Sequence, residues 1–420
     1  MIKKIFSHSF WLLIGNSIGR LSIFLTNIVA ARLLSQEDFG QFAMIRNTIS
    51  MIEGMISGTI GSPVIKRSSE MYTKDSFASI FKALLLVNIT IAIIMASSIL
   101  LFAPYITDVF FKSNLEFMQG LYIGVFLLLT TSLSTFIQNI FIGIEKYQKL
   151  AIASIYTSLF SFPIILFLIY NYKLYGVLYG ISFYFFIDFM FKYYQFQKIV
   201  PIAFEIPDFM LIRDEAKRLF LFSYPLFWAI LVSSVSFWYA RIIIVDTDGF
   251  SSLAIFDAAF QWLTVIMIVT GATTSVVLPM LSKINLKIDS KMYNKTILIN
   301  LGINLIIASF FAFIFTFFSK EIMSIYGDKY IEGYTVLIIL SITSIFFSLS
   351  SIMNKVFISI NYSLEIFYIN FISSSLILIL LKLNFLSGAV GLSYSFLYFY
   401  FCNCMLYFLI YLYKRWSKDV

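Results

Sequence analysis

Apolar segments of about 20 residues recur along the whole chain, and short polar connections separate them. A helix needs about 20 apolar residues to cross a bilayer, and the apolar positions here follow a helical period rather than strict alternation. The pattern therefore predicts an all-α membrane protein with twelve transmembrane helices. Their approximate ranges are 10–31, 42–62, 77–101, 117–139, 149–170, 176–197, 221–243, 253–276, 296–318, 334–353, 364–382 and 388–412.

The two halves of this pattern resemble each other. The segment ARLLSQEDFG at 31–40 matches ARIIIVDTDG at 240–249, and FIGI at 141 matches FISI at 357. Gly176 likewise matches Gly388, and all these pairs are separated by about 209–216 residues. Six helices per repeat is an even number, so we expect two parallel six-helix lobes, with a substrate site between them.

The division between the lobes is expected at the longest connection, which carries two prolines and mixed charge. We predict an N-terminal lobe over 1–198, a cytoplasmic linker with an amphipathic segment over 199–220, and a C-terminal lobe over 221–420.

Composition and charge support this topology. Of the residues, 60% are hydrophobic and only 12% are charged, which leaves no room for a soluble catalytic domain. The net charge of +8 comes from lysines and arginines gathered in every second connection, so it does not indicate a nucleic-acid partner. By the positive-inside rule, both the N-terminus and the C-terminus are predicted to be cytoplasmic.

Residue types that carry catalysis or bind metals are sparse. Cys402 and Cys404 point to different faces of one helix, and His8, the only histidine, precedes the first helix. We predict no catalytic residue, no metal site and no cofactor.

Polar side chains at bilayer depth mark a candidate binding site instead. Arg20 lies in the first segment and Arg46 in the second, although an intramembrane charge costs about 2.5–3.5 kcal/mol. Arginine binds phosphate bidentately and stays charged when desolvated, so a water-filled cationic cavity for an anionic group is the favoured interpretation. A structural alternative is that Arg46 snorkels to the interface or pairs with Asp257, its counterpart in the second repeat. The other polar side chains expected to line the cavity are Asn16, Asn27, Ser50, Glu53 and Gln261.

Three intramembrane carboxylates are candidates for binding a coupling ion, either Na⁺ or H⁺. They are Asp188, Asp257 and Glu53. For Asp188, a buried ion pair is an equally good interpretation.

Two motifs carry a resemblance to a known family. The helix with a mid-membrane arginine followed by ARLLSQEDFGQFA, and the turn FIGIEKYQKLAIAS at 141–154, resemble Wzx-type O-antigen and capsule repeat-unit flippases. These flippases belong to the multidrug/oligosaccharidyl-lipid/polysaccharide exporter (MOP) superfamily, which also contains the MATE transporters.

The resemblance implies a substrate, a fold and a location. It implies transport of an undecaprenyl-diphosphate-linked oligosaccharide from the cytoplasmic to the periplasmic leaflet of a bacterial inner membrane, through a central cationic cavity. The arginines of related lipid II flippases map onto Arg20 and Arg46. Where relatives often place a further cavity arginine in the second lobe, this chain has Asp257. Expected partners are membrane lipids and the polymerase and chain-length regulator of the same pathway, with the chain itself a monomer.

Two other functions compete with this interpretation. A multidrug or metabolite exporter of the same superfamily that carries cations would be expected to have a cavity lined by carboxylates, and the two arginines of the first lobe argue against this function. A membrane polysaccharide polymerase would want a large periplasmic loop with catalytic residues, whereas the longest connection here is predicted to be cytoplasmic.

Overall fold

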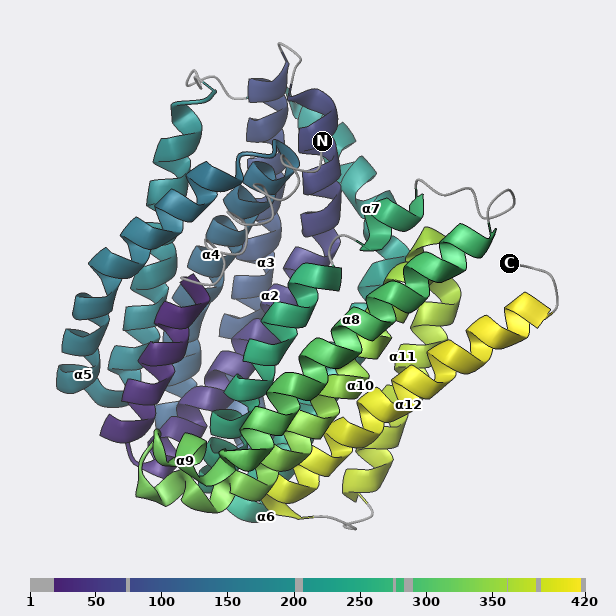
Figure 1. Ribbon diagram of the computed structural model, residues 1–420. Helices are drawn as coiled ribbons and strands as arrows, with labels where there is room; N and C mark the ends of the chain where they lie inside the picture. The colour runs from purple at the N-terminus through teal and green to yellow at the C-terminus, as the bar shows by residue number, and fades with distance from the viewer. Residues whose placement is uncertain are drawn as a thin grey trace. The chain divides into compact units, whose positions relative to one another are not determined.

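The computed structural model describes residues 19–72, 76–200, 207–274, 277–282, 290–360, 362–382 and 387–416 (Figure 1). Across these ranges, all regular secondary structure is helical. The chain divides into two compact units, Met1–Ile230 and Leu231–Val420, which we call unit 1 and unit 2.

Unit 1 is a helical bundle built around α4. A first helix occupies residues 19–33. It is followed by α2 (Gln36–Met71), α3 (Phe77–Phe110), α4 (Leu115–Gly143) and α5 (Tyr147–Gln197). Helix α4 packs against α2, α3 and α5, so its polar residues contact three neighbours. Helix α5 is two helices joined at Lys173, whose φ is 47°, and the second packs back against the first, as the contact of Gly180 with Ile165 shows.

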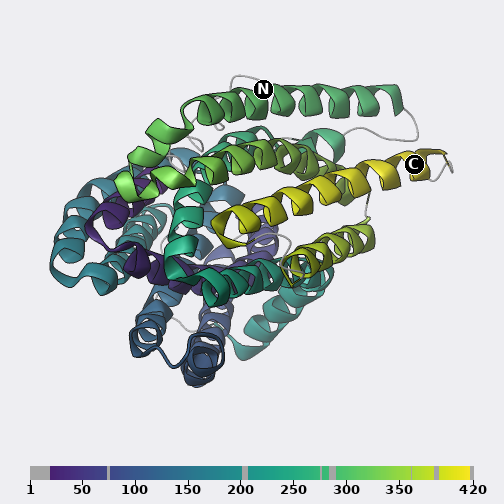
Figure 2. The same ribbon diagram turned by 90° about the horizontal axis from the view of Figure 1, so that it is seen from below.

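Unit 2 is built around α10 in a similar way. Helix α6 (Phe209–Thr274) begins in unit 1 and continues into unit 2. The remaining elements are α7 (Val277–Ser282), α8 (Ser290–Phe317), α9 (Ser319–Ser324), a 3-10 helix η1 (Asp328–Gly333), α10 (Tyr334–Ser359), α11 (Ser363–Lys382) and α12 (Gly388–Trp416). Helices α8 and α12 both pack on α10, and the three lie side by side in Figures 1 and 2.

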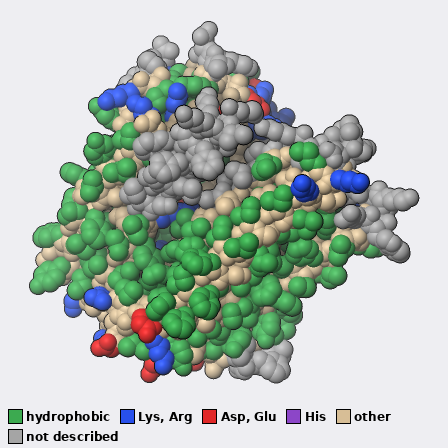
Figure 3. All heavy atoms as spheres, viewed as in Figure 1, with side chains coloured by type: hydrophobic (Ala, Val, Ile, Leu, Met, Phe, Trp, Pro, Cys, Tyr) green, Lys and Arg blue, Asp and Glu red, His purple; other side chains and the backbone are tan. Residues whose placement is uncertain are grey.

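The predicted all-α fold with twelve membrane helices is confirmed. Eight helices of the described part are long and apolar enough to cross a membrane, and two of them, α5 and the α6 span, contain a break that divides each into two segments. The helix at 19–33 and α2 lie at the positions of the first two predicted segments. Helix α2 is more polar than the rest because it carries the arginine and glutamate of the candidate site. Figure 3 shows hydrophobic side chains over the helices of one face and charged side chains near their ends.

The two repeats end their first helices differently. In unit 1 the chain breaks before α2, where the Ser35 hydroxyl caps the helix by accepting a hydrogen bond from the Asp38 amide at 3.0 Å. In unit 2 the break lies at Gly249, whose φ of 80° favours glycine. Gly40, which the sequence aligned with Gly249, lies inside α2 instead. The repeat is therefore preserved in the order of helices but not at every turn residue.

The predicted linker over 199–220 contains the start of a long helix. Helix α6 starts at Phe209 and continues without a described break to Gly249. Glu215 on this stretch is buried, and its carboxylate accepts two hydrogen bonds from Nε of Arg67 on α2, at 3.1 and 3.0 Å. This ion pair attaches the start of α6 to the end of α2 within unit 1.

Candidate functional site

The first and second helices are joined by Arg46. Its Nη1 donates a hydrogen bond to Oδ1 of Asn27 at 3.0 Å, and its guanidinium lies 5.5 Å from the centroid of the Phe42 ring. Asn27 is buried and Arg46 is half-buried. An arginine carries five N–H donors in a fixed planar arrangement, and the bond to Asn27 orients the guanidinium between the two helices.

Arg20 lies at a different depth from Arg46. It is exposed and stands seven residues before Asn27 on the same helix, a rise of about 10 Å. The adjacent Gly19 is approached so closely by Tyr184 of α5 that an added Cβ would lie 2.8 Å from the tyrosine oxygen. This packing fixes the helix beside Arg20. The two predicted site arginines thus occupy two levels of the bundle, and Asn16 lies outside the described residues.

Two further predicted residues follow Arg46 along α2. Ser50 is exposed. Glu53 is half-buried at the midpoint of α2, and its carboxylate accepts a hydrogen bond from the Thr135 hydroxyl of α4 at 3.3 Å. The polar residues of α2 therefore extend from Arg46 into a contact with α4.

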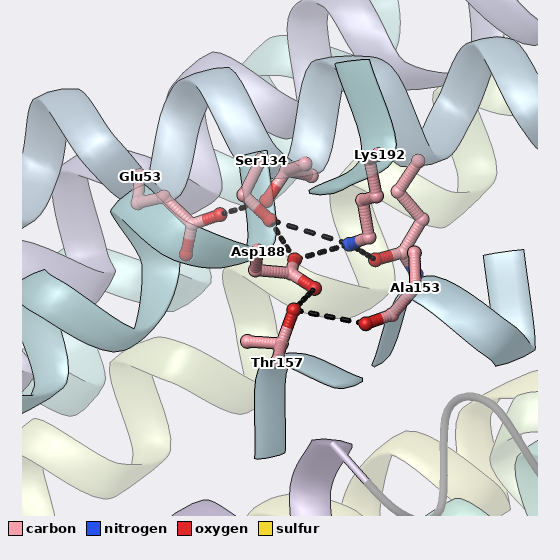
Figure 4. A network of polar contacts seen from close by, with 8 residues as sticks. Glu53, Ser134, Ala153, Thr157, Asp188 and Lys192 are labelled. Carbon is pink, nitrogen blue, oxygen red and sulfur yellow. Dashed lines mark hydrogen bonds and ion pairs between the residues drawn. The ribbon is translucent and has the colours of Figure 1, made fainter. Parts of the chain in front are cut away.

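Asp188 is the centre of a buried polar network between α4 and α5, close to the contact of Glu53 with α4 (Figure 4). It forms an ion pair with Lys192 one turn along α5 and accepts a hydrogen bond from Ser134 of α4. Thr157 donates to its second oxygen at 3.4 Å, and Lys192 also donates to Gln138 at 3.3 Å. Asp188 and Lys192 are only 3% and 2% exposed. Of the two interpretations left open for Asp188, this geometry is that of the buried pair.

In unit 2, Asp257 pairs with Arg241 inside α6. Arg241 Nε lies 3.6 Å from Asp257 Oδ1, and both side chains are buried. The arginine is surrounded by three rings, those of Phe256, Phe260 and Phe396, at 5.3–5.5 Å from their centroids. Cation–π contacts of this kind favour a charged guanidinium in an otherwise apolar environment. Asp257 is thus held within its own bundle.

Gln261 is also an interior residue of unit 2. It is 4% exposed, and its side-chain oxygen accepts a hydrogen bond from the Tyr326 hydroxyl at 3.3 Å. Its polar group is therefore used in joining α6 to the segment after α9.

Sequence reasoning missed the two buried basic partners. The predicted segments 176–197 and 221–243 contain Lys192 and Arg241, but neither residue was expected there to be the buried partner of a carboxylate. The spacing of Asp188 and Lys192, four residues apart, places them on one helix face and is a signal for the first pair. The second pair joins residues on either side of the Gly249 break, so no helical spacing indicates it.

The described residues contain no group of three or more histidine, cysteine, aspartate or glutamate side chains that could hold a metal ion. The chemistry that the site offers is the recognition of charge and hydrogen-bonding groups.

Comparison with known proteins gives one family match. The model of the polysaccharide biosynthesis protein family matches residues 5–285, more than half of the chain. No curated protein sequence matches significantly.

Several solved transporter structures share the fold. A multidrug resistance MATE family transporter of the MOP superfamily, in an inward-facing conformation, aligns with a TM-score of 0.76 at 13% identity, covering 97% of this chain and 98% of its own. The eukaryotic MATE transporter AtDTX14 aligns with a TM-score of 0.74 at 13% identity, covering 99% and 96%. A MOP superfamily transporter from Pyrococcus furiosus, described as having a binding pocket of reversed polarity, aligns with a TM-score of 0.69 at 14% identity, covering 99% and 95%. At these identities the likeness establishes the fold alone.

Proposed function

Because this chain belongs to the polysaccharide biosynthesis protein family and has the fold of MOP-superfamily transporters, we propose that it is a flippase for lipid-linked oligosaccharides. The proposed substrate is a polysaccharide repeat unit on undecaprenyl diphosphate, moved from the cytoplasmic to the periplasmic leaflet of a bacterial inner membrane. Family and fold identify a multi-pass membrane transporter rather than an enzyme, and the arginines of the first two helices support the choice of an anionic cargo.

The barrier to this transport is electrostatic. A diphosphate and the hydroxyl groups of sugars lose their hydration in a bilayer, and desolvating such groups is costly unless they are paired or hydrogen-bonded. A guanidinium compensates a phosphate with charge and two parallel hydrogen bonds. The polyprenyl chain needs no such help, because it can remain in lipid throughout.

Two arginines at different depths can bind a moving anion at two successive positions, whereas a single binding site would hold it at one. On the predicted topology, Arg20 lies about 10 Å closer to the cytoplasmic side than the contact between Arg46 and Asn27. We propose that the diphosphate passes from Arg20 to Arg46 during alternating access. With the cytoplasm negative, each negative charge moved outward is favoured by about 2.3 kcal/mol per 100 mV.

The observation that carries this proposal is the guanidinium of Arg46, held half-buried between two helices by the neutral side chain of Asn27. The Asn27 amide orients the guanidinium without adding a negative charge.

The test is to replace each arginine in cells that make a surface polysaccharide dependent on this protein. Arg46→Ala and Arg20→Ala should each abolish surface polysaccharide and leave lipid-linked repeat units on the cytoplasmic face. Arg46→Lys should keep only part of the activity if recognition is bidentate. Arg32→Ala, at the exposed end of the same first helix, is the matched control and should remain active.

Membrane levels of each variant should be measured by immunoblot, so that loss of transport is separated from loss of protein. Normal surface polysaccharide in both Arg20→Ala and Arg46→Ala at normal protein levels would refute the proposed role of the arginines.

A multidrug exporter is the second candidate, because two of the similar solved structures are MATE transporters. It predicts that deletion of the protein sensitises cells to cationic drugs while surface polysaccharide is unaffected. The flippase proposal predicts loss of surface polysaccharide with unchanged drug sensitivity.

The expected partners of the proposed flippase are membrane lipids and the polymerase and chain-length regulator that use the flipped repeat unit, and the transporter is expected to be a monomer.

A further inference from the structure

The two arms of α5 form an apolar groove on the surface of unit 1. The first arm runs from Tyr147 to the break at Lys173, and the second returns beside it to Gln197. A cavity of about 350 Å³ lies between them, which is a size typical of small ligand sites. The lining side chains that the structure describes are all apolar or aromatic, namely Phe160, Ile187, Met190, Phe191 and Tyr194.

The groove opens toward the outside of the bundle. Phe160, Met190 and Tyr194 are 57%, 42% and 54% exposed, although their side chains are large and hydrophobic. Both arms belong to a described helix that is long and apolar enough to cross a membrane, so the medium around the groove is the bilayer. Lipid chains are as apolar as the groove, and a lipid bound there selectively must therefore be recognised by its polar end as well.

A lysine continues the lining of the groove on each arm. On the second arm, the lining residues lie at positions i, i+3, i+4 and i+7, and Lys198 follows at i+11 on the same helix face. Its Nζ lies 4.3 Å from the centroid of the Tyr194 ring, so the charge lies against the last side chain of the groove. On the first arm, Lys149, Tyr156 and Phe160 lie at i, i+7 and i+11 and share a face in the same way.

The antiparallel register of the arms brings the two lysines to the same end of the groove. The rings of Tyr156 and Phe191 join the arms, with their centroids 6.1 Å apart. Lys149 precedes Tyr156 by seven residues and Lys198 follows Phe191 by seven, so each lysine lies about 10 Å beyond this contact in the same direction. In the part of the chain that the structure describes, no acidic side chain lies within salt-bridge distance of either lysine.

We propose that this groove binds one anionic phospholipid, with an acyl chain between the arms of α5 and the phosphate group between Lys149 and Lys198. The groove from Ile187 to Lys198 rises about 16 Å along the helix, which is close to the ~15 Å of one hydrocarbon leaflet. On the predicted topology the lysines lie on the cytoplasmic side, where anionic lipids give the membrane its negative surface potential.

The two lysines determine which lipid is preferred. They attract a headgroup with a net negative charge, whereas the positive amine of a zwitterionic headgroup offsets its own phosphate. A polyprenyl chain is several times longer than the groove, so a phospholipid of ordinary chain length matches the groove better. The proposal concerns a membrane lipid and holds whatever cargo the transporter carries.

The experiment uses the full-length protein in detergent, freed of lipid and titrated with phosphatidylglycerol or phosphatidylcholine of identical chains. Native mass spectrometry counts the bound lipids, and the midpoint of thermal unfolding is measured in parallel. The first phosphatidylglycerol should bind with at least ~10-fold higher affinity than phosphatidylcholine. It should also raise the midpoint, because a ligand that binds the folded state stabilises it. Added salt should reduce the preference.

The headgroup contacts are tested by removing both lysines. Lys149→Ala with Lys198→Ala should lower the affinity for phosphatidylglycerol by at least ~10-fold, to the level of phosphatidylcholine. Arg213→Ala with Lys217→Ala is the matched control, because it removes the same charge from exposed positions at the start of α6, and it should bind as the original protein does.

The chain contacts are tested by filling the groove. Met190→Trp should weaken the binding of the first phosphatidylglycerol, because the indole ring occupies the space of the acyl chain. Met405→Trp, at a residue of α12 that is 41% exposed, introduces the same side chain outside the groove and should leave binding unchanged. Thermal unfolding shows that each variant is folded before its lipid affinity is compared.

Three results would overturn the site. Equal affinities of the original protein for the two phospholipids would mean that the groove holds only bulk lipid. An unchanged preference after loss of both lysines would place the headgroup elsewhere. Displacement of phosphatidylglycerol by an equal concentration of undecaprenyl phosphate would make a polyprenyl lipid the occupant. No transport is measured, so failure of the phospholipid site is distinguishable from failure of the flippase proposal.

Discussion

The buried pair of Asp188 and Lys192 gives the sharpest energetic prediction for unit 1. Lys192→Met would leave the Asp188 carboxylate 3% exposed, with only the hydroxyls of Ser134 and Thr157 to compensate it. Removing one partner of such a pair typically costs about 3–5 kcal/mol, because an uncompensated charge stays buried. Asp188→Asn should cost less, since Lys192 keeps acceptors on Ser134 and Gln138.

Replacing both partners removes the uncompensated charge. The double variant Asp188→Asn with Lys192→Met should therefore be more stable than Lys192→Met alone, because a buried ion pair replaced by neutral groups is often close to neutral in stability. The difference from additivity should be about 2–3 kcal/mol in favour of the double variant.

The assay is the thermal unfolding midpoint of the protein in detergent. For a unit of roughly 200 residues, 1 kcal/mol corresponds to about 2–4 °C, so Lys192→Met should lower the midpoint by about 6–20 °C. Glu365→Gln is a suitable control, because the Glu365–Lys414 pair is partly exposed, at 25% and 27%, and should contribute less than about 1 kcal/mol.

The reasoning would be refuted if Lys192→Met and the double variant melted at the same temperature. In that case the charge of Asp188 would not be the source of the loss. Single variants as stable as the original protein would refute it equally.

Two further predictions concern contacts between helices. Glu215→Gln should destabilise unit 1 by about 3 kcal/mol, because Glu215 is 2% exposed and its carboxylate accepts hydrogen bonds from Arg67. Glu70→Gln is the control: its exposed carboxylate lies 3.8 Å from the same arginine, and its loss should cost less than about 1 kcal/mol. Equal effects of the two variants on the thermal unfolding midpoint would contradict this prediction. Gly249→Ala should cost about 1–3 kcal/mol from its backbone conformation alone (φ of 80°, ψ of 174°), since an added Cβ meets nothing within 4 Å. Gly176→Ala should be far worse, because its Cβ would overlap a backbone carbonyl of the preceding helix; similar yields of folded protein for the two alanine variants would show that steric overlap is not decisive.

Helix number and the presence of two repeats were accessible from the sequence because the bilayer imposes them. A span needs about 20 apolar residues wherever it lies, so each of the twelve segments could be recognised locally. The matched ends of α4 at Gly143 and α10 at Ser359 agree with the repeat of FIGI and FISI. The orientation of the termini still rests on the positive-inside rule, because a fold by itself carries no direction across the membrane.

The partners of the intramembrane charges were not accessible in the same way. A single sequence shows that Asp188, Asp257 and Glu53 are charged and lie at depth, but three environments are compatible with that pattern. Asp188 pairs with Lys192 one turn away on the same helix, whereas Asp257 pairs with Arg241 on the other side of the break in α6. Glu53 accepts a hydrogen bond from Thr135 of α4, 82 residues away.

Local hydrophobicity was therefore enough to define the segments, because the free energy of inserting a helix into a bilayer depends mainly on the apolar content of that helix. The chemistry of each buried charge depends on which neighbours packing brings within about 3–4 Å, and those neighbours lie up to 148 residues away, as Arg67 and Glu215 do. Packing of the helices against one another therefore decides which carboxylates form buried ion pairs, as Asp188 and Asp257 do, and which are hydrogen-bonded by a hydroxyl, as Glu53 is.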